Sequence, residues 1–213
     1  LNAQLVDGAS GAQIWADRFD GPRRELAALQ DRVVSEIARR LNGTLIQADE
    51  KWIARRGVIS TGAQDETALG WAAYYRPRSA ETLEAARSHF EKALAIDSAA
   101  IDAMTGLATT LATIVMNGLS GGDPKIDLAR AESLVRAAKA SEPNNALVAF
   151  ADGWIAKASG MVDRAVDSFS RALQLNPNHP DSMRQLAECY LFAGEPRRSI
   201  DQTERFLRLS PYD

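Results

Sequence analysis

Cysteine, histidine and long apolar runs are all scarce in this sequence of 213 residues. A single cysteine cannot form a disulfide within the chain, so the fold does not depend on oxidation and we expect a reducing, cytoplasmic location. No apolar run approaches the ~18 residues that a membrane-spanning helix requires. The formal net charge of −3 argues against general nucleic-acid binding, which needs a basic face to neutralise phosphates.

Motifs for cofactors and catalysis are also missing. No glycine-rich phosphate loop occurs, and His89 and His179 cannot form a metal site without carboxylates from elsewhere. We expect His179 to lie in a turn between repeats and His89 to face solvent or a neighbouring helix. Cys189 has no adjacent basic residue that would lower its pKa, which predicts a buried, unreactive thiol. We therefore predict no catalytic residue, cofactor or metal, and we predict that this chain is not itself an enzyme.

The first 20 residues alternate between apolar and polar in two short runs, separated by turn-forming residues at 7–11. This pattern predicts a β-hairpin. A lone hairpin is marginal in water, so it should pair with a missing upstream sheet, a second copy of the chain or the following helices. Because the chain begins at Leu1 rather than methionine, we expect a fragment of a longer protein.

From residue 23 onward the pattern becomes helical. Apolar residues three and four apart predict one amphipathic helix over residues 23–41, and a second helical run follows at 45–56 before a linker at 58–64. The apolar positions of the first helix are Leu26, Leu29, Val33, Ile37 and Leu41. This helix could cap the end of the helical array that follows, or it could form the seam of a homodimer, for which the hairpin edge also offers a surface.

After residue 65 the sequence repeats itself. Pro143, Pro177 and Pro211 recur every 34 residues, and so do three sets of small or aromatic positions. These sets are Ala131, Ala165 and Ser199; Val135, Phe169 and Thr203; and Ala138, Ala172 and Phe206. An earlier unit is offset by 45 residues, so 11 extra residues must lie between Leu111 and Ala131, where residues 117–124 have the composition of a loop.

A helix–turn–helix unit explains this pattern. Small residues such as Gly153 and Ala165 would let two antiparallel helices approach closely, and Phe169 would fill the space between neighbouring units. Proline would end the second helix of each unit, because it cannot continue the hydrogen-bond ladder. One such unit cannot bury its apolar face alone, so stacked units would share a continuous core.

These residues resemble tetratricopeptide repeats, whose pattern places Gly, Ala, Phe, Ala and Pro where the third unit has Gly153, Ala165, Phe169, Ala172 and Pro177. Asp152 stands where leucine is usual, Ser199 and Thr203 replace Ala and Phe, and residues 69–74 fit loosely. The resemblance implies a mainly α fold: a right-handed α-α superhelix preceded by a β-hairpin and two helices. The expected units span residues 66–99, 100–145, 146–179 and 180–213 within a repeat domain at 65–213.

The first third resembles a segment found upstream of such repeats in bacterial class III adenylate/guanylate cyclase-like proteins and winged-helix regulators. The residues that carry this resemblance are 1–20 and the Leu-Gln-Asp run at 29–31. The resemblance implies that residues 1–43 are the end of a TolB-like α/β domain, followed by a connecting segment at 44–64. The chain would then be the C-terminal regulatory module of a cyclase-like signalling protein or, alternatively, the sensing module of a winged-helix transcriptional regulator.

A binding surface is the remaining candidate site. In stacked repeats the first helices line the concave face, and we expect a protein or peptide to bind there. The predicted site residues are Phe150, Trp154, Lys157, Arg184, Gln185 and Glu188, with Asp181 at an equivalent offset. Trp154 would anchor an extended peptide, while Lys157 and Arg184 would hold a carboxylate. The alternative is that Trp154 packs between units and the cations are solvated. The Asn and Lys pattern of carboxylate-clamping repeats is not met, so we do not expect capture of a chaperone C-terminus.

Overall fold

The computed structural model describes residues 2–6, 13–18 and 62–209. Strand β1 (Asn2–Val6) pairs antiparallel with strand β2 (Gln13–Arg18), with Leu5 opposite Trp15. The register shifts between Leu5 and Val6. The helices expected at 23–41 and 45–56, and the homodimer seam expected on the first of them, lie outside the described residues. The assignment of residues 1–43 to a TolB-like domain stays a prediction.

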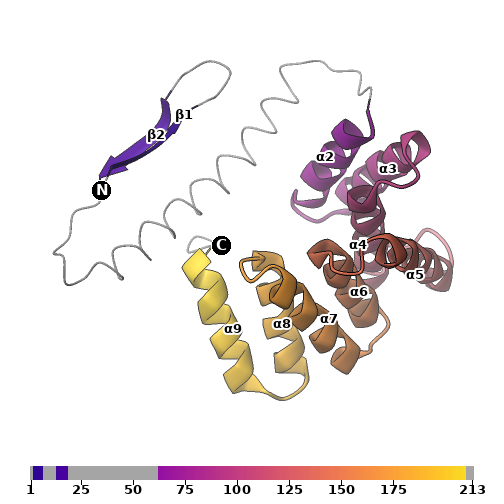
Figure 1. The fold of residues 1–213 in the computed structure, drawn as a ribbon. Coiled ribbons are helices and arrows are strands. Elements are labelled where there is room, and N and C mark those ends of the chain that lie inside the picture. Colours follow the sequence, from indigo (N-terminus) through magenta and orange to yellow (C-terminus); the bar gives the residue numbers. More distant parts are fainter. Residues whose placement is uncertain (1, 7–12, 19–61, 210–213) are drawn as a thin grey trace.

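The remaining described residues form eight helices arranged in consecutive pairs. The pairs are α2 (Ala63–Tyr74) with α3 (Ala80–Ile96), α4 (Ile101–Met116) with α5 (Pro124–Ser141), α6 (Ala146–Ala158) with α7 (Val162–Leu175), and α8 (Pro180–Phe192) with α9 (Pro196–Leu209). Figure 1 shows these pairs stacked along a curved path, with α2 and α3 at one end and α8 and α9 at the other. The mainly α, solenoid-type fold predicted from the repeat pattern is confirmed.

Local sequence signals set the helix starts. Ser79 Oγ accepts from the backbone N–H of Thr82 at 3.1 Å, and Thr82 Oγ1 accepts in return from the Ser79 N–H at 3.0 Å, which makes a capping box before α3. Asp123 caps α5 just before Pro124, a residue suited to the first helical position. Asn145 caps α6 by accepting from the backbone at 2.8 Å.

The helix ends also follow a repeated rule. Gly118, Gly160 and Gly194 each adopt a positive φ just after α4, α6 and α8. At each end the next N–H bonds back to a carbonyl five residues earlier, as from Met161 to Ala156 at 2.8 Å. This arrangement is a Schellman motif, which needs a left-handed residue and therefore favours glycine. The second helices end shortly before a proline, as the proline spacing predicts: α5 ends before Pro143 and α7 ends before Pro177.

The core repeats one contact between glycine and phenylalanine. Phe169 of α7 is fully buried against Gly153 of α6, where an added Cβ would lie 2.6 Å from the ring. Ala165 is also fully buried, so the predicted packing positions Gly153, Ala165 and Phe169 are confirmed. Phe90 of α3 fills the equivalent space, but it packs against two glycines, Gly70 and Gly106. The loosely matching stretch at 69–74 therefore makes the same kind of contact as its better-matched counterpart.

The 11 extra residues lie where the sequence placed them, although they do not all form a loop. Helix α4 has 16 residues where α6 has 13, and α5 has 18 where α7 has 14. The connection at 117–123 replaces the shorter connection at 159–161. Differences of three residues in α4, four in the loop and four in α5 account for the insertion. Composition identified the glycine-rich loop but not the two helix extensions.

Candidate functional site

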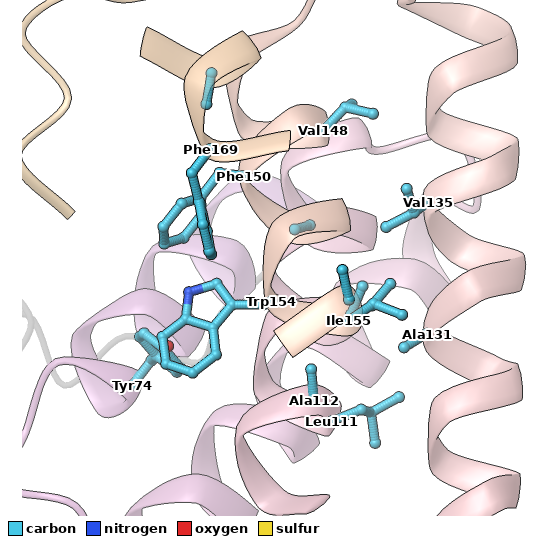
Figure 2. Close-up of a cluster of buried hydrophobic side chains, with 14 of the residues drawn as sticks. Tyr74, Leu111, Ala112, Ala131, Val135, Val148, Phe150, Trp154, Ile155 and Phe169 are labelled. Atoms are coloured by element: carbon cyan, nitrogen blue, oxygen red, sulfur yellow. The ribbon is translucent and has the colours of Figure 1, made fainter. Parts of the chain in front are cut away.

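Three of the six predicted groove residues are buried. Phe150 and Trp154 are each 2% exposed and Gln185 is 1% exposed. Figure 2 draws Trp154 inside a cluster of buried side chains that includes Tyr74 and Phe150. The rings of Trp154 and Phe150 meet edge to face, with their centroids 6.4 Å apart. The prediction that these aromatic rings line an open groove is therefore wrong in this structure. The alternative, that Trp154 packs between units, describes its environment.

Two cations lie over the indole ring of Trp154. Arg78 Cζ, from the loop at residues 75–79 between α2 and α3, is 5.4 Å from the ring centroid, and Lys157 Nζ is 5.3 Å from it. Both distances fall within the range of cation–π attraction, which is stronger where water is excluded. The aromatic anchor expected for a ligand is thus already covered by charged groups of the chain itself.

The predicted cations have internal partners. Lys157 Nζ donates to Gln185 Oε1 at 2.7 Å and to Glu188 Oε2 at 2.6 Å, which links α6 to α8. The Lys157 side chain is only 9% exposed, while that of Glu188 is 41% exposed. Arg184 Nη2 donates to Asp181 Oδ1 at 3.0 Å within α8. The alternative that these cations are solvated is wrong for Lys157, because it is enclosed and ion-paired.

A contact between the two ends of the array completes this cluster. Tyr75 Oη, at the end of α2, donates to Asp181 Oδ2 at the start of α8 over a distance of 2.8 Å. The two residues are 106 positions apart in sequence. We call the surface made by Trp154, Lys157, Asp181, Arg184, Gln185 and Glu188 the inner face. The structure brings all six together, and it adds Tyr75 and Arg78, which the repeat pattern did not single out.

Burial changes the chemistry of polar groups beneath the inner face. Tyr74 Oη lies 3.2 Å from Thr113 Oγ1, and burial raises the pKa of Tyr74 above its ordinary value. The indole N–H of Trp154 and the hydroxyl of Thr109 are buried without a hydrogen-bond partner. Each unpaired buried polar group costs free energy, of the order of 1–3 kcal/mol. Close packing in this part of the core therefore leaves two polar groups without a hydrogen bond.

The two histidines and the cysteine have structural surroundings. His179 caps α8, with its Nδ1 accepting from the backbone N–H of Ser182 at 3.1 Å, and burial lowers its pKa. His89 lies 2.7 Å from Glu66 Oε2, so it faces the neighbouring helix α2. Cys189 is buried, and burial raises the pKa of its thiol, as expected for an unreactive side chain.

A small cleft lies between α5, α6 and α7. It has a volume of about 240 Å³ and is lined by Lys139, Pro143, Val148, Ala149, Asp152, Asp167, Ser168 and Arg171. Asp152, the departure from the repeat pattern, accepts there from Ser168 Oγ at 2.7 Å. No group of three or more potential ligands for a metal occurs within residues 62–209 or the two strands. In that same part of the chain, no helix has the length and apolar character needed to cross a membrane.

Comparisons with known proteins agree with this architecture. Residues 156–205 match the tetratricopeptide repeat family. A thermophilic tetratricopeptide protein of Thermus thermophilus, TTC0263, superposes with a TM-score of 0.59 at 21% identity, covering 84% of this chain and 93% of that one. The pilF protein of Pseudomonas aeruginosa gives 0.52 at 24% identity, covering 71% and 62%. Both likenesses show the shared fold.

A curated relative is much longer than this chain. "Putative adenylate cyclase 3" of Rhizobium meliloti (strain 1021) is 28% identical over 124 residues. The match covers 58% of this chain but 21% of the relative, so it spans about a fifth of that protein's length. The predicted resemblance to tetratricopeptide repeat proteins and to cyclase-like proteins is confirmed. Together, the family match and the structural likeness show a fold of the tetratricopeptide type.

Proposed function

We propose that this chain is the protein-interaction module of a larger adenylate cyclase-like signalling protein, and that its partner segment binds on the inner face. The observation that carries this proposal is the convergence of polar and charged groups from the α2–α3 loop, α6 and α8 around Trp154. Side chains from three helix pairs meet there, so a partner that binds them would sense the curvature of the whole array.

The exposed groups of the inner face are the ones available to a partner. Arg184 is 43% exposed and Glu188 is 41% exposed, while Trp154, Phe150 and Gln185 support them from beneath. Charged groups at the rim of an interface steer association and set register, whereas buried aromatic rings beneath them hold the surface rigid. We assign partner contact to Arg184 and Glu188, with Lys157 fixing the position of the Glu188 carboxylate.

The link to a cyclase rests on the similarity to the curated relative, whose remaining length leaves room for a catalytic domain outside the matched region. A repeat module attached to such a domain would transmit partner binding to it through relative motion or through local concentration. The module itself would take no part in the chemical step.

Charge reversal on the inner face tests both parts of the proposal in the full-length protein. Glu188→Lys removes the carboxylate partner of Lys157 at a side chain that is 41% exposed, while Glu204→Lys makes the same change at an exposed position on α9. Circular dichroism of each variant checks that it is folded before binding is compared. Quantitative affinity capture should recover proteins that wild type and Glu204→Lys retain and Glu188→Lys loses. Equal recovery by all three proteins would refute the inner-face assignment.

The cyclase assignment is tested separately by conversion of ATP to cyclic AMP. The full-length protein should have this activity, and Glu188→Lys should change its response to a captured partner while Glu204→Lys should not. A full-length protein with no cyclase activity would refute the assignment to a cyclase-like protein. Activity that responds equally in all three proteins would refute regulation through this module.

A further inference from the structure

The loop at residues 75–79 covers the inner face with two side chains of distinct chemistry. Tyr75 presents a hydroxyl to Asp181, and Arg78 presents a guanidinium to the ring of Trp154. We propose that this loop occupies the site as an internal substitute for a ligand, and that the external ligand is a basic peptide segment carrying a tyrosine. This inference rests on the proposed function of the inner face.

The chemistry of the covered groups sets the class of ligand. If the loop leaves, Asp181 Oδ2 loses its hydroxyl donor and the face of Trp154 loses one of its two cations. Lys157 and Arg184 remain paired with Glu188 and Asp181, so the charges of both cations are already balanced within the chain and no ligand carboxylate is needed to balance them. A donor to Asp181 and a cation for Trp154 are therefore what an incoming segment must provide. An acidic segment would supply no cation to the face of Trp154, so it would not replace the contact that Arg78 makes.

The contacts that the loop makes with the inner face are weak enough for a peptide to replace them. Tyr75 is 52% exposed, so its bond to Asp181 competes with water and contributes little to the stability of the fold. The covering loop is nonetheless tethered, which gives it a high effective concentration at the site. A free peptide with the same groups binds only the fraction of molecules in which the loop has opened, so its apparent affinity is reduced by that fraction.

The connection that carries Tyr75 and Arg78 is longer than two of the other connections within helix pairs. Five residues connect α2 to α3, whereas three connect α6 to α7 and three connect α8 to α9. The capping box at Ser79 fixes where the loop ends. Between α2 and this cap, the side chain of Tyr75 contacts α8 of the fourth pair and that of Arg78 contacts α6 of the third.

Peptide binding to variants of the whole chain tests the substitution. The probe is a capped peptide with the sequence of residues 74–79, Tyr-Tyr-Arg-Pro-Arg-Ser, and titration calorimetry measures its dissociation constant. The double variant Tyr75→Phe with Arg78→Ala should bind it about tenfold more tightly than wild type, because removing the internal contacts increases the open fraction. Adding Asp181→Asn should return binding to the wild-type level or below.

Two matched controls accompany this measurement. Arg76→Ala lies in the same loop, and its side chain makes no hydrogen bond or ion pair within residues 62–209, so it should leave the affinity unchanged. A peptide with glutamate in place of both arginines should bind no more tightly to the double variant than to wild type. Equal affinity of the basic peptide for wild type and the double variant would refute the substitution by the loop.

Trypsin cleavage after Arg78 gives a second readout that needs no peptide affinity. Arg78 must leave Trp154 to enter a protease, so Tyr75→Phe should raise the cleavage rate several-fold over wild type, and Arg76→Ala should not. An unchanged rate would refute the inference. Tight binding of the acidic peptide alone would refute the ligand class while leaving the inner face as a binding site. Binding of neither peptide to any variant would also count against the proposed function.

Discussion

A methyl group added at Gly153 would be placed inside the ring of Phe169. Its Cβ would lie 2.6, 2.7 and 2.8 Å from three carbons of that ring, and the ring is fully buried, so it cannot move into solvent. Overpacking of this kind costs about 1–3 kcal/mol, and alanine's better helix propensity offsets about 1 kcal/mol of it. We therefore expect Gly153→Ala to lower the free energy of unfolding by about 1 kcal/mol.

Chemical denaturation followed by circular dichroism measures this effect, with two comparisons. Gly121→Ala lies in the α4–α5 loop, where an added Cβ meets nothing within 4 Å, and it should change the unfolding free energy by less than about 0.5 kcal/mol. In a Phe169→Leu background, two of the three contacted ring atoms are gone. The loss caused by Gly153→Ala should then shrink, giving a coupling energy of about 1 kcal/mol.

The result that would refute this reasoning is a gain in stability. If Gly153→Ala raised the unfolding free energy, as the same change does at exposed helix positions, the ring would not fill the space above Gly153. A loss of equal size in both backgrounds would mean that the clash is with something other than Phe169.

Three further predictions concern single groups. Because burial lowers the pKa of His179, the unfolded chain binds a proton more readily, so stability should fall as pH drops from about 7 through the lowered pKa. His179→Asn keeps a capping oxygen without titrating, and thermal melts at about pH 7.5 and about pH 5 should show a smaller loss for it than for wild type. An identical pH dependence in both proteins would contradict this account. Gly160→Ala forces a side chain to a φ of +72° and should cost about 1 kcal/mol in a denaturant titration, so an unchanged midpoint would argue against the Schellman motif. Cys189 should react with a disulfide reagent only at the rate of unfolding, as measured by absorbance with and without denaturant, whereas fast reaction of the native protein would contradict its burial.

Repeat spacing predicted the contacts that form between sequence neighbours. Gly153, Ala165 and Phe169 lie within one helix pair, so the same contact recurs with the repeat and leaves a period in the sequence. The match at 69–74 looked poor because Gly70 lies 20 residues before Phe90, whereas Gly153 lies 16 residues before Phe169. The longer α2–α3 connection and a later position of Phe90 within α3 together move Gly70 out of register with the pattern. Its packing against Phe90 is nevertheless the same.

Contacts between distant repeats leave no such period. Tyr75 and Asp181 meet because the array curves enough to bring its first and fourth helix pairs together. Curvature depends on small angles at every interface, which residue spacing does not report. For this reason the repeat spacing did not reveal that Arg78 lies over the ring of Trp154 or that Glu188 pairs with Lys157.

The double contact of Phe90 makes the array unequal along its length. One ring is clamped between a helix of the first pair and a helix of the second, through Gly70 and Gly106, so these pairs should come apart together. In the last pair, Thr203 stands where the third has Phe169, so the equivalent position carries no aromatic ring. Amide protons should therefore exchange fastest in α8 and α9. Unfolding would begin in this last helix pair and proceed toward the first two pairs, which Phe90 joins.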